Sequence, residues 1–247
     1  MEKKKPIMAM VPGGTGGIGR EVVKMFLKNG TEVVVPTRGL KDDYSSVDEE
    51  AIVVKNNYYE DEDVKSLART YDKVDTFVYC VGSFRGHKKI SDFTYEDIDD
   101  KFKTNIRSFW NFLRHFVPLM REKGYGNVIA IGSLAAKRKE PYLGLSSWAK
   151  DGLASIIETL SNEESVNGIR ANIIVPSIVD TAKERLIFPQ DNQAYWLPAS
   201  YIEELVEFLC YDARSRYLNG NRLECYVPNK KIVRAREENL INRGVNI

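Results

Sequence analysis

The sequence predicts an α/β fold: a doubly wound parallel sheet in three layers, with helices on both faces. Short apolar runs alternate with helix-period segments along almost the whole chain. The apolar runs are continuous, as in strands that are buried on both faces. A third observation is the glycine-rich stretch that follows the first apolar run. We find no break in composition, so we expect one domain over residues 1–228 and a charged tail over 229–247.

The strands are predicted where apolar residues form uninterrupted short runs. In chain order these runs are 6–11, 32–35, 51–54, 76–81, 127–131, 170–175 and 222–227. The helices are predicted where apolar residues recur with a helical period, at 19–28, 61–70, about 95–124, 147–161 and 202–211. In the first helix Val22, Val23 and Phe26 share one face, and Gly30 ends it.

Composition excludes several classes of protein. Acidic and basic residues nearly cancel, at 35 and 36, which argues against a nucleic-acid binder. The three cysteines show no CxxC spacing and the two histidines form no cluster, so we expect no metal site. No apolar run has the length of a signal peptide or a membrane span. We therefore expect no membrane association and a reduced, cytoplasmic setting.

The glycine-rich stretch PGGTGGIGR, at 12–20, joins the first predicted strand to the first predicted helix. Glycines there allow a tight turn and a close approach of the backbone to a diphosphate, and the helix N-terminus offers free N–H groups. Its position between strand and helix makes the pattern specific for a dinucleotide. The residues expected to bind the cofactor here are Gly13, Thr15, Gly16, Gly17, Ile18 and Gly19.

The second strand ends at Thr37 and Arg38, where folds of this kind contact the adenosine ribose. An acid at this end would bind the 2′-hydroxyl of NAD, whereas arginine suits the 2′-phosphate of NADP. The stretch holds Arg38 and no acid. We therefore predict NADP(H) in preference to NAD(H).

Taken in order, the motifs resemble those of the short-chain dehydrogenase/reductase family over about residues 6–228, which implies a Rossmann-type fold. The segment 13–19 is similar to the cofactor loop of the family. The resemblance assigns contacts to the cofactor to residues beyond the loop: Asn57 and Tyr58 after the third strand, Gly82 after the fourth, and Pro176, Ile178 and Thr181 after the sixth. It also implies that Asn105 is the active-site asparagine and Ser133 the catalytic serine.

One residue departs from the resemblance. The family uses a Tyr-x-x-x-Lys pair, in which the lysine holds the nicotinamide ribose and lowers the pKa of the tyrosine that moves the proton. In SSWAK, at 146–150, the lysine is Lys150 and the tyrosine position holds Ser146. An aliphatic hydroxyl is a far weaker acid than a phenol and reaches less far into a cleft. Ser146 should not simply replace it.

Three alternatives follow from the missing phenol. In the first alternative a displaced tyrosine gives or takes the proton, and Tyr142 is the first candidate and Tyr195 the second. Otherwise water or a substrate group supplies the proton, which suits reduction of an activated C=C bond. In the third alternative the chain binds NADP(H) without turnover, as a sensor or a structural partner. We favour an NADP(H)-dependent oxidoreductase acting on a carbonyl or an activated C=C bond.

The sequence indicates the class of substrate and the oligomeric state only in general terms. The segment 182–198 should cover the substrate, and its apolar residues favour a small apolar or aromatic molecule. The basic residues Lys137, Arg138 and Lys139 follow Ser133 and are interpreted as a solvated surface. By analogy with the family, the helices near 94–120 and 147–161 predict a homodimer or homotetramer.

Overall fold

The computed structural model describes residues 5–39, 47–82, 88–189 and 193–227, and it confirms the doubly wound fold. Seven strands form one parallel sheet in the order β3-β2-β1-β4-β5-β6-β9. They are β1 (Met8–Met10), β2 (Glu32–Thr37), β3 (Ile52–Lys55), β4 (Thr76–Tyr79), β5 (Gly126–Ile131), β6 (Ile169–Pro176) and β9 (Arg222–Cys225). The order reverses between β1 and β4, and in open parallel sheets ligands bind outside the carboxyl ends at such a point.

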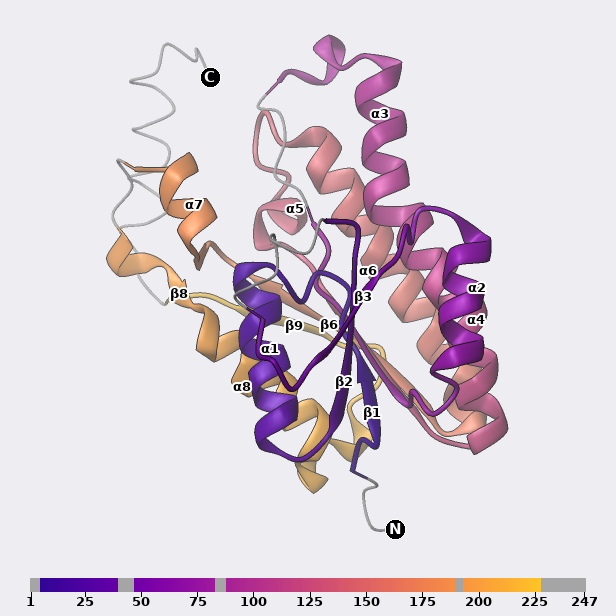
Figure 1. Ribbon diagram of the computed structural model, residues 1–247. Helices are drawn as coiled ribbons and strands as arrows, with labels where there is room; N and C mark the ends of the chain where they lie inside the picture. Colours follow the sequence, from indigo (N-terminus) through magenta and orange to yellow (C-terminus); the bar gives the residue numbers. More distant parts are fainter. Residues whose placement is uncertain (1–4, 40–46, 83–87, 190–192, 228–247) are drawn as a thin grey trace.

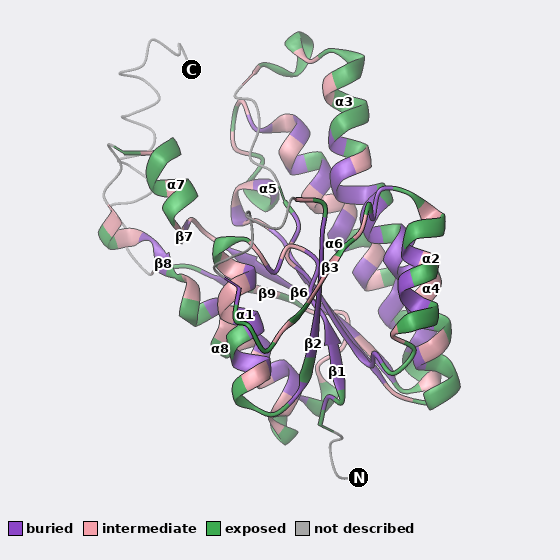
Figure 2. Ribbon diagram, viewed as in Figure 1, coloured by how far each residue is buried: buried purple, intermediate pink, exposed green. Residues whose placement is uncertain are grey.

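Helices cover both faces of this sheet (Figure 1). One face carries α1 (Gly17–Lys28) and α8 (Ala199–Tyr211), and the other carries α2 (Asp61–Thr70), α4 (Ser108–Lys123) and α6 (Gly144–Glu164). Figure 2 shows the central strands buried between helices whose outer faces are exposed, while the edge strands β3 and β9 are only partly buried. The continuous apolar runs therefore form the central layer, as the sequence predicts.

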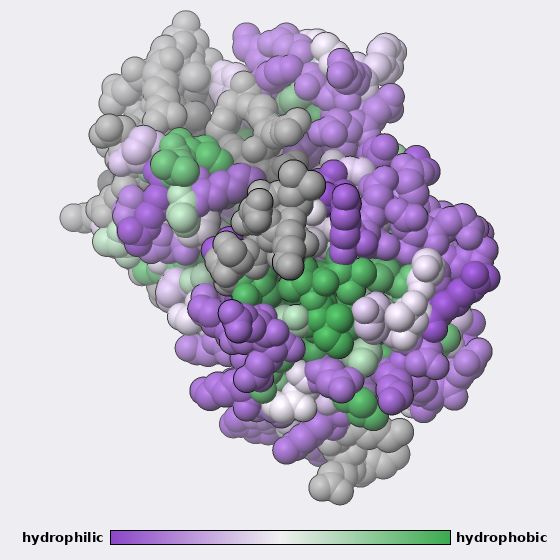
Figure 3. All heavy atoms as spheres, viewed as in Figure 1, coloured by the Kyte–Doolittle hydropathy of each residue, from purple (hydrophilic) through white to green (hydrophobic). Residues whose placement is uncertain are grey.

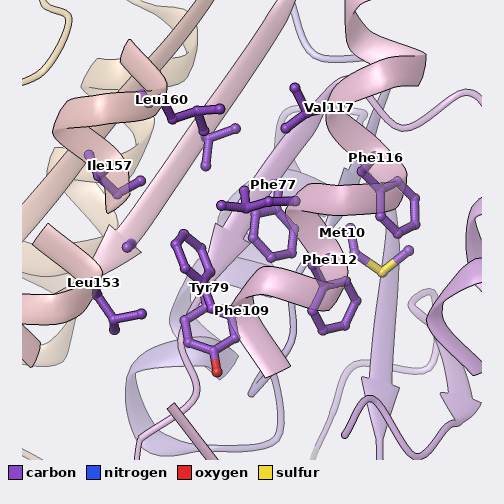
Figure 4. Close-up of a cluster of buried hydrophobic side chains, with 14 of the residues drawn as sticks. Met10, Phe77, Tyr79, Phe109, Phe112, Phe116, Val117, Leu153, Ile157 and Leu160 are labelled. Atoms are coloured by element: carbon purple, nitrogen blue, oxygen red, sulfur yellow. The ribbon is translucent and has the colours of Figure 1, made fainter. Parts of the chain in front are cut away.

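Two apolar cores lie between the layers. The core under α2, α4 and α6 is rich in aromatic rings, with Phe77 at its centre (Figure 4). The Phe77 ring lies 5.1 Å from the ring of Phe112 and 6.0 Å from that of Phe109, measured between centroids. The core under α1 and α8 is built mostly from aliphatic side chains such as Val22 and Val206. Both cores stiffen the strands whose carboxyl ends carry the site.

The prediction of one continuous helix over 95–124 is wrong. The segment divides into α3 (Tyr95–Lys101), a π-helical segment (Phe102–Arg107) and α4. The predicted end holds, because Gly124 takes the left-handed conformation with φ 62° that terminates a helix. An inserted π turn changes which residues face the core, so this correction bears directly on the site.

Further elements lie beyond the carboxyl ends of the strands. The sequence did not predict α5 (Leu134–Arg138), α7 (Ala182–Ile187), or the two-stranded sheet of β7 (Val179–Asp180) and β8 (Leu197–Pro198). Four short 3₁₀ turns complete the described elements: Ile90–Asp92, Ser165–Asn167, Gln193–Tyr195 and Ala213–Tyr217. The predicted tail, 229–247, lies outside the described residues.

The surface shown in Figure 3 is largely hydrophilic, with apolar residues gathered in its middle, over the β2–β3 edge of the sheet. On β3, Ile52 is 39% exposed. Over the described residues, no helix has the length and apolar character that a membrane crossing requires. Among the same residues no group of His, Cys, Asp or Glu side chains has the arrangement of a metal site.

Candidate functional site

The glycine loop lies against the end of β4, and its glycines are required by close packing. The amide of Cys80 donates to the carbonyl of Pro12 at 2.9 Å. A Cβ on Gly13, which has φ +82°, would lie 2.7 Å from the Cys80 carbonyl carbon. A Cβ on Gly19 would lie 2.2 Å from the Gly13 oxygen. The sequence predicted this close turn correctly, and the roles of the loop residues in binding a cofactor stay a prediction.

The N-terminus of α1 opens at the loop without a side-chain cap. Its N-cap residue is Gly16, which has no side chain to offer to the first amides. The first turn of a helix leaves N–H groups without intrahelical partners and carries the positive end of the helix dipole. Arg20 bonds the carbonyl of Thr15 at 2.8 Å and steadies the loop, while Ile18 packs on the core below. This geometry suits a diphosphate.

Lys150 reaches the carboxyl ends of the two central strands. Its Nζ donates to the carbonyl of Ile131 at 2.8 Å and to that of Val81 at 3.4 Å. A Cβ on Gly82 would lie 3.1 Å from the same nitrogen, so glycine keeps the backbone close to the ammonium. Burial lowers the pKa of Lys150 to about 8, an effect that Cys80 opposes and the charge of Lys101 reinforces.

Three serines lie on the segments that follow β5 and β6 and on the first turn of α6, which also carries Lys150. Ser133 follows β5 directly and lines, with Lys150 and Asp151, a cavity of about 10 Å³, which is room for about one water molecule. The hydroxyls of Ser146 and Ser177 are buried and have no hydrogen-bond partner among the described residues. Buried polar atoms are normally bonded, so these two hydroxyls suggest a group that binds beside them.

Asn105 lies in the π segment and is 2% exposed. Its side-chain amide donates to the carbonyl of Lys101 at 3.3 Å. The hydroxyl of Tyr79 donates toward the carbonyls of Thr104 and Asn105, at 3.1 and 3.3 Å. Tyr79 also contacts the hydroxyl of Ser108 at 2.5 Å. Tyr79, which is fully buried among apolar side chains at the end of β4 (Figure 4), thus binds carbonyls of the π segment, and the sequence motif gave no sign of this.

The end of β2 carries a cluster of cations and rings. The Arg38 guanidinium carbon lies 3.9 Å from the centroid of the Tyr59 ring and 5.5 Å from that of Tyr58. Lys103 approaches the Tyr59 ring at 5.4 Å and pairs with Glu60 at 3.7 Å. Burial raises the pKa of Tyr58, while its hydrogen bond with Arg38 opposes the rise.

The remaining predicted adenosine contact, Asn57, is exposed beside this cluster, and its backbone amide donates to Asp63 at 3.3 Å. The structure therefore brings Arg38 and Tyr58 together, with Asn57 next in the chain. Tyr59 was missed, because its position in the core followed only from the fold.

The segment after β6 folds over the glycine loop. A Cβ on Gly17 would lie 2.6 Å from the Thr181 side chain, so the two residues are packed together. The Thr181 hydroxyl accepts from the amide of Glu184 at 3.2 Å and caps α7. Pro176 ends β6, and the carbonyl of Ile178 accepts from Leu197 at 2.9 Å. The structure thus brings Thr181 to the loop as the resemblance implied, while its contact with a nicotinamide stays a prediction.

The two tyrosines proposed as displaced acids are not joined to this group by any described contact. Tyr142 has φ 65°, an unusual left-handed conformation for a tyrosine, and its carbonyl accepts from the Lys88 amide at 3.2 Å. Tyr195 lies in the 3₁₀ turn before β8 and is half-buried. Their role as proton donors stays a prediction.

The basic residues after Ser133 are occupied by partners on neighbouring elements. Lys137 pairs with Glu224 and Lys139 pairs with Asp151. The guanidinium of Arg138 lies 5.8 Å from the centroid of the Tyr226 ring. These contacts agree with a surface role. The buried lysine near the site is instead Lys101, which is 3% exposed and which the motif comparison did not indicate.

Comparison with known proteins gives the same fold and a family. The family model described as short chain dehydrogenase matches residues 7–192. The chain is similar to an uncharacterized oxidoreductase of Staphylococcus haemolyticus, 29% identical over 182 residues that cover 70% of this chain and 78% of the relative. It is also similar to an NADPH-dependent pterin aldehyde reductase of Arabidopsis thaliana, 25% identical over 205 residues that cover 78% of this chain and 83% of the relative.

Solved structures share the architecture. ElxO with NADP bound superposes with a TM-score of 0.79 at 18% identity, covering 91% of this chain and 97% of the other. A 3-ketoacyl-(acyl-carrier-protein) reductase from Brucella melitensis complexed with NADH gives a TM-score of 0.76 at 21% identity, covering 90% and 96%. The family model spans most of the chain and includes the glycine loop and Lys150. The chain therefore belongs to the short-chain dehydrogenase family and is an oxidoreductase of that type.

Proposed function

We propose that this protein is an NADP(H)-dependent reductase that acts on a carbonyl or an activated C=C bond of a small molecule. The observation that carries the proposal is the Lys150 ammonium, held by the carbonyls of Val81 and Ile131 at the switch point of the sheet. The open N-terminus of α1 lies at the same edge, as do the hydroxyls of Ser146 and Ser177, which are unpartnered within the part of the chain that the structure describes. A domain without a ligand would have no use for this combination.

The residues present fit a nicotinamide dinucleotide. The loop from Gly13 to Gly19 would hold the diphosphate, Lys150 the nicotinamide ribose, and Asn57 and Tyr58 the adenine. The segment Pro176, Ile178 and Thr181 would bind the nicotinamide end. A reduced nicotinamide supplies a hydride when bound. The protein's own part is then to orient the substrate oxygen, through Ser133 and Asn105, and to manage its charge and proton.

The choice of NADP(H) rests on Arg38. Its exposed guanidinium is stacked on the Tyr59 ring, so its planar donors are oriented before any phosphate arrives. The similar solved structures do not decide between NADP(H) and NAD(H), because one of them holds NADP and another holds NADH. The pterin aldehyde reductase similar to this chain is named as NADPH-dependent, which supports both the cofactor and a carbonyl substrate.

Calorimetry with NADPH and NADH tests this preference. We expect wild type to bind NADPH at least about tenfold more tightly, because an arginine–phosphate pair is a charge-assisted, bidentate contact. Arg38→Gln should lose most of that difference and leave NADH binding unchanged. Arg69→Gln, an exposed arginine of α2, is the matched control. Tighter binding of NADH by wild type would refute the preference.

Turnover is tested with a panel of ketones, aldehydes and conjugated enoyl compounds, followed by NADPH oxidation. In this proposal Ser146 occupies the position of the family tyrosine. Ser146→Tyr should therefore raise the rate on carbonyl substrates, since it restores a positioned phenol. Tyr142→Phe tests the displaced tyrosine directly: a large loss of rate would support it. Binding of NADPH with no turnover of any substrate would instead favour the non-catalytic alternative.

We also propose that the chain forms a homodimer through the outer face of the α3–α4 helix and α6. Three large rings are exposed there: Phe102 (44%), Trp110 (55%) and Trp148 (46%). The rings of Phe102 and Trp148 stack, with centroids 6.3 Å apart, so the two helices present one aromatic surface. Aromatic residues are enriched in the buried centres of interfaces.

A further inference from the structure

The turn that follows β3 lies against the end of β2. The two strands pair in parallel, with Thr37 opposite Lys55, and the amide of Asn56 donates to the carbonyl of Thr37 at 2.8 Å. Arg38 is the residue after Thr37, and Tyr59 lies in the turn that follows Asn56. The pairing of the strands therefore brings together an arginine and a tyrosine that are far apart in the sequence.

The ring of Tyr59 supports the guanidinium of Arg38 on its face. The guanidinium carbon lies 3.9 Å from the ring centroid, which is the distance of carbon atoms in van der Waals contact. Tyr59 is 8% exposed, so its ring belongs to the core. The ring of Tyr58 stands at 86° to that of Tyr59, and its centroid lies 5.5 Å from the same guanidinium carbon. Arg38 thus contacts two rings that are almost at right angles.

The turn that carries Tyr59 is fixed to the π segment. The hydroxyl of Tyr59 donates to that of Thr104 at 3.2 Å. The next residue, Glu60, pairs with Lys103 at 3.7 Å and with Arg107 at 3.4 Å. Each exposed ion pair contributes little, but all three partners belong to the same segment. The ring on which Arg38 is stacked is therefore held in place.

Two cations contact the Tyr59 ring, and they differ in what else they bind. Lys103 lies 5.4 Å from the ring centroid, and its charge is paired with Glu60. Arg38 is exposed and forms no ion pair within the described part of the chain. A stacked guanidinium keeps its N–H donors in its own plane, so they remain available to a phosphate. A side chain that is already ordered also loses less conformational entropy when it binds.

We propose that Tyr59 is a positioning residue that sets the preference for NADP(H) over NAD(H). Its ring orders Arg38 in the free protein, so that the guanidinium meets the 2′-phosphate with its donors already oriented. NADH carries a hydroxyl in place of this phosphate and gains nothing from the ordered arginine. Tyr59 acts through Arg38 and is assigned no contact with the cofactor. This inference rests on the proposed function.

A double-mutant cycle tests the coupling, with affinities measured by calorimetry. Tyr59→Leu removes the ring, and we expect NADPH affinity to fall about three- to fivefold, as for the loss of an exposed cation–ring contact, with NADH affinity unchanged. Tyr59→Phe keeps the ring and should stay within about twofold of wild type. Tyr59→Leu added to Arg38→Gln should have no further effect. Tyr71→Leu, which removes a half-buried ring from the same core, is the matched control and should change neither affinity.

A second readout needs no cofactor. Protons that lie over the face of an aromatic ring are shielded, so their NMR signals move upfield. The Arg38 Nε–H signal is identified as the one missing from Arg38→Gln. It should lie upfield of the ordinary arginine position in wild type and in Tyr59→Phe, and return to that position in Tyr59→Leu. The wild-type signal tests the contact even where Tyr59→Leu does not fold.

The outcomes are distinct. If neither dinucleotide binds, the proposed function fails and this inference fails with it. If both bind with equal affinity to wild type, the choice of cofactor and this inference are both wrong. A preference for NADPH that survives Tyr59→Leu would overturn this inference alone, as would an unshifted Arg38 signal in wild type. Equal losses of NADPH and NADH affinity would show that Tyr59 only supports the fold, and would also contradict the inference.

Discussion

Lys150 shows how a single side chain is set by its surroundings. Two carbonyl acceptors hold its ammonium, yet burial disfavours the charge and lowers its pKa to about 8. An unfolded lysine has a pKa of about 10.4. The charge that would hold a ribose is therefore present at neutral pH, and it lowers the free energy of unfolding there.

The pH dependence of stability follows from this difference. Between about pH 8 and 10 Lys150 binds more protons in the unfolded chain than in the folded chain. The contribution of Lys150 to the free energy of unfolding therefore rises with pH in this range. Lys150→Met should abolish that rise and should be more stable than wild type near pH 7. Denaturant unfolding of both proteins at several pH values checks this, with Lys65→Met, which replaces a surface lysine of α2, as control. Parallel curves for wild type and Lys150→Met would contradict the assignment.

The residues of the site differ in how far sequence could predict them. Gly13 and Gly19 could be predicted because a strand–turn–helix with close packing requires glycine at fixed spacing. Lys150 followed from the resemblance of SSWAK, at 146–150, to the Tyr-x-x-x-Lys pair of the family. Tyr59 could not be predicted as a contact of Arg38, because the two residues are far apart in the sequence. Their contact depends on the turn that follows β3, which only the fold determines.

At the scale of elements, the π segment between α3 and α4 is the main departure from prediction. It frees backbone carbonyls that an α-helix would pair, and the Tyr79 hydroxyl binds those of Thr104 and Asn105. Tyr79 is fully buried, and burial raises its pKa well above the ordinary value, so it stays a neutral donor. The strand β4 thereby fixes the helix turn that carries Asn105.

Tyr79→Phe should therefore destabilise the protein. The substitution keeps the ring but removes the hydroxyl donor of the buried Asn105 carbonyl, which costs about 1–3 kcal/mol, while Ser108 still donates to the carbonyl of Thr104. Chemical denaturation measures the change in the free energy of unfolding. Tyr71→Phe is the matched control, since Tyr71 is half-buried and its hydroxyl has no hydrogen bond among the described residues; it should change stability by less than about 0.5 kcal/mol. Equal effects of the two substitutions would show that the hydroxyl of Tyr79 contributes nothing.

The strands and the ends of most helices were predictable, because continuous apolar runs and Gly124 are local signals. The π segment, α5 and α7 were not. A π turn inserts one residue without a change of composition, so its sequence 102–107 has the pattern of an ordinary helix. The helix α7 is short and its residues are largely exposed, with Leu186 83% exposed, so it lacks the apolar face on which a helix prediction depends.

At the scale of the whole molecule, the helical layers differ in what they leave exposed. The layer of α2, α4 and α6 buries a ring-rich core on its inner face and still exposes Trp110 and Trp148 on its outer face. A monomer would leave these rings in water. A second copy of the same face would cover them and would also hold α6, and with it Lys150, against the sheet.

Trp148→Glu tests this assembly. A carboxylate at the centre of an apolar interface is desolvated without a partner, which costs several kcal/mol in the dimer, whereas in the monomer it stays in water and only the stacking on Phe102 is lost. Wild type should scatter light as twice the 28.2 kDa mass of the chain, and the variant as a single chain. Tyr217→Glu is the control, because Tyr217 is 81% exposed in the turn after α8, away from this face. Because α6 carries Lys150, the monomeric variant should also bind NADPH more weakly than the control. A wild-type monomer at micromolar concentration would show that the exposed rings do not mark an interface.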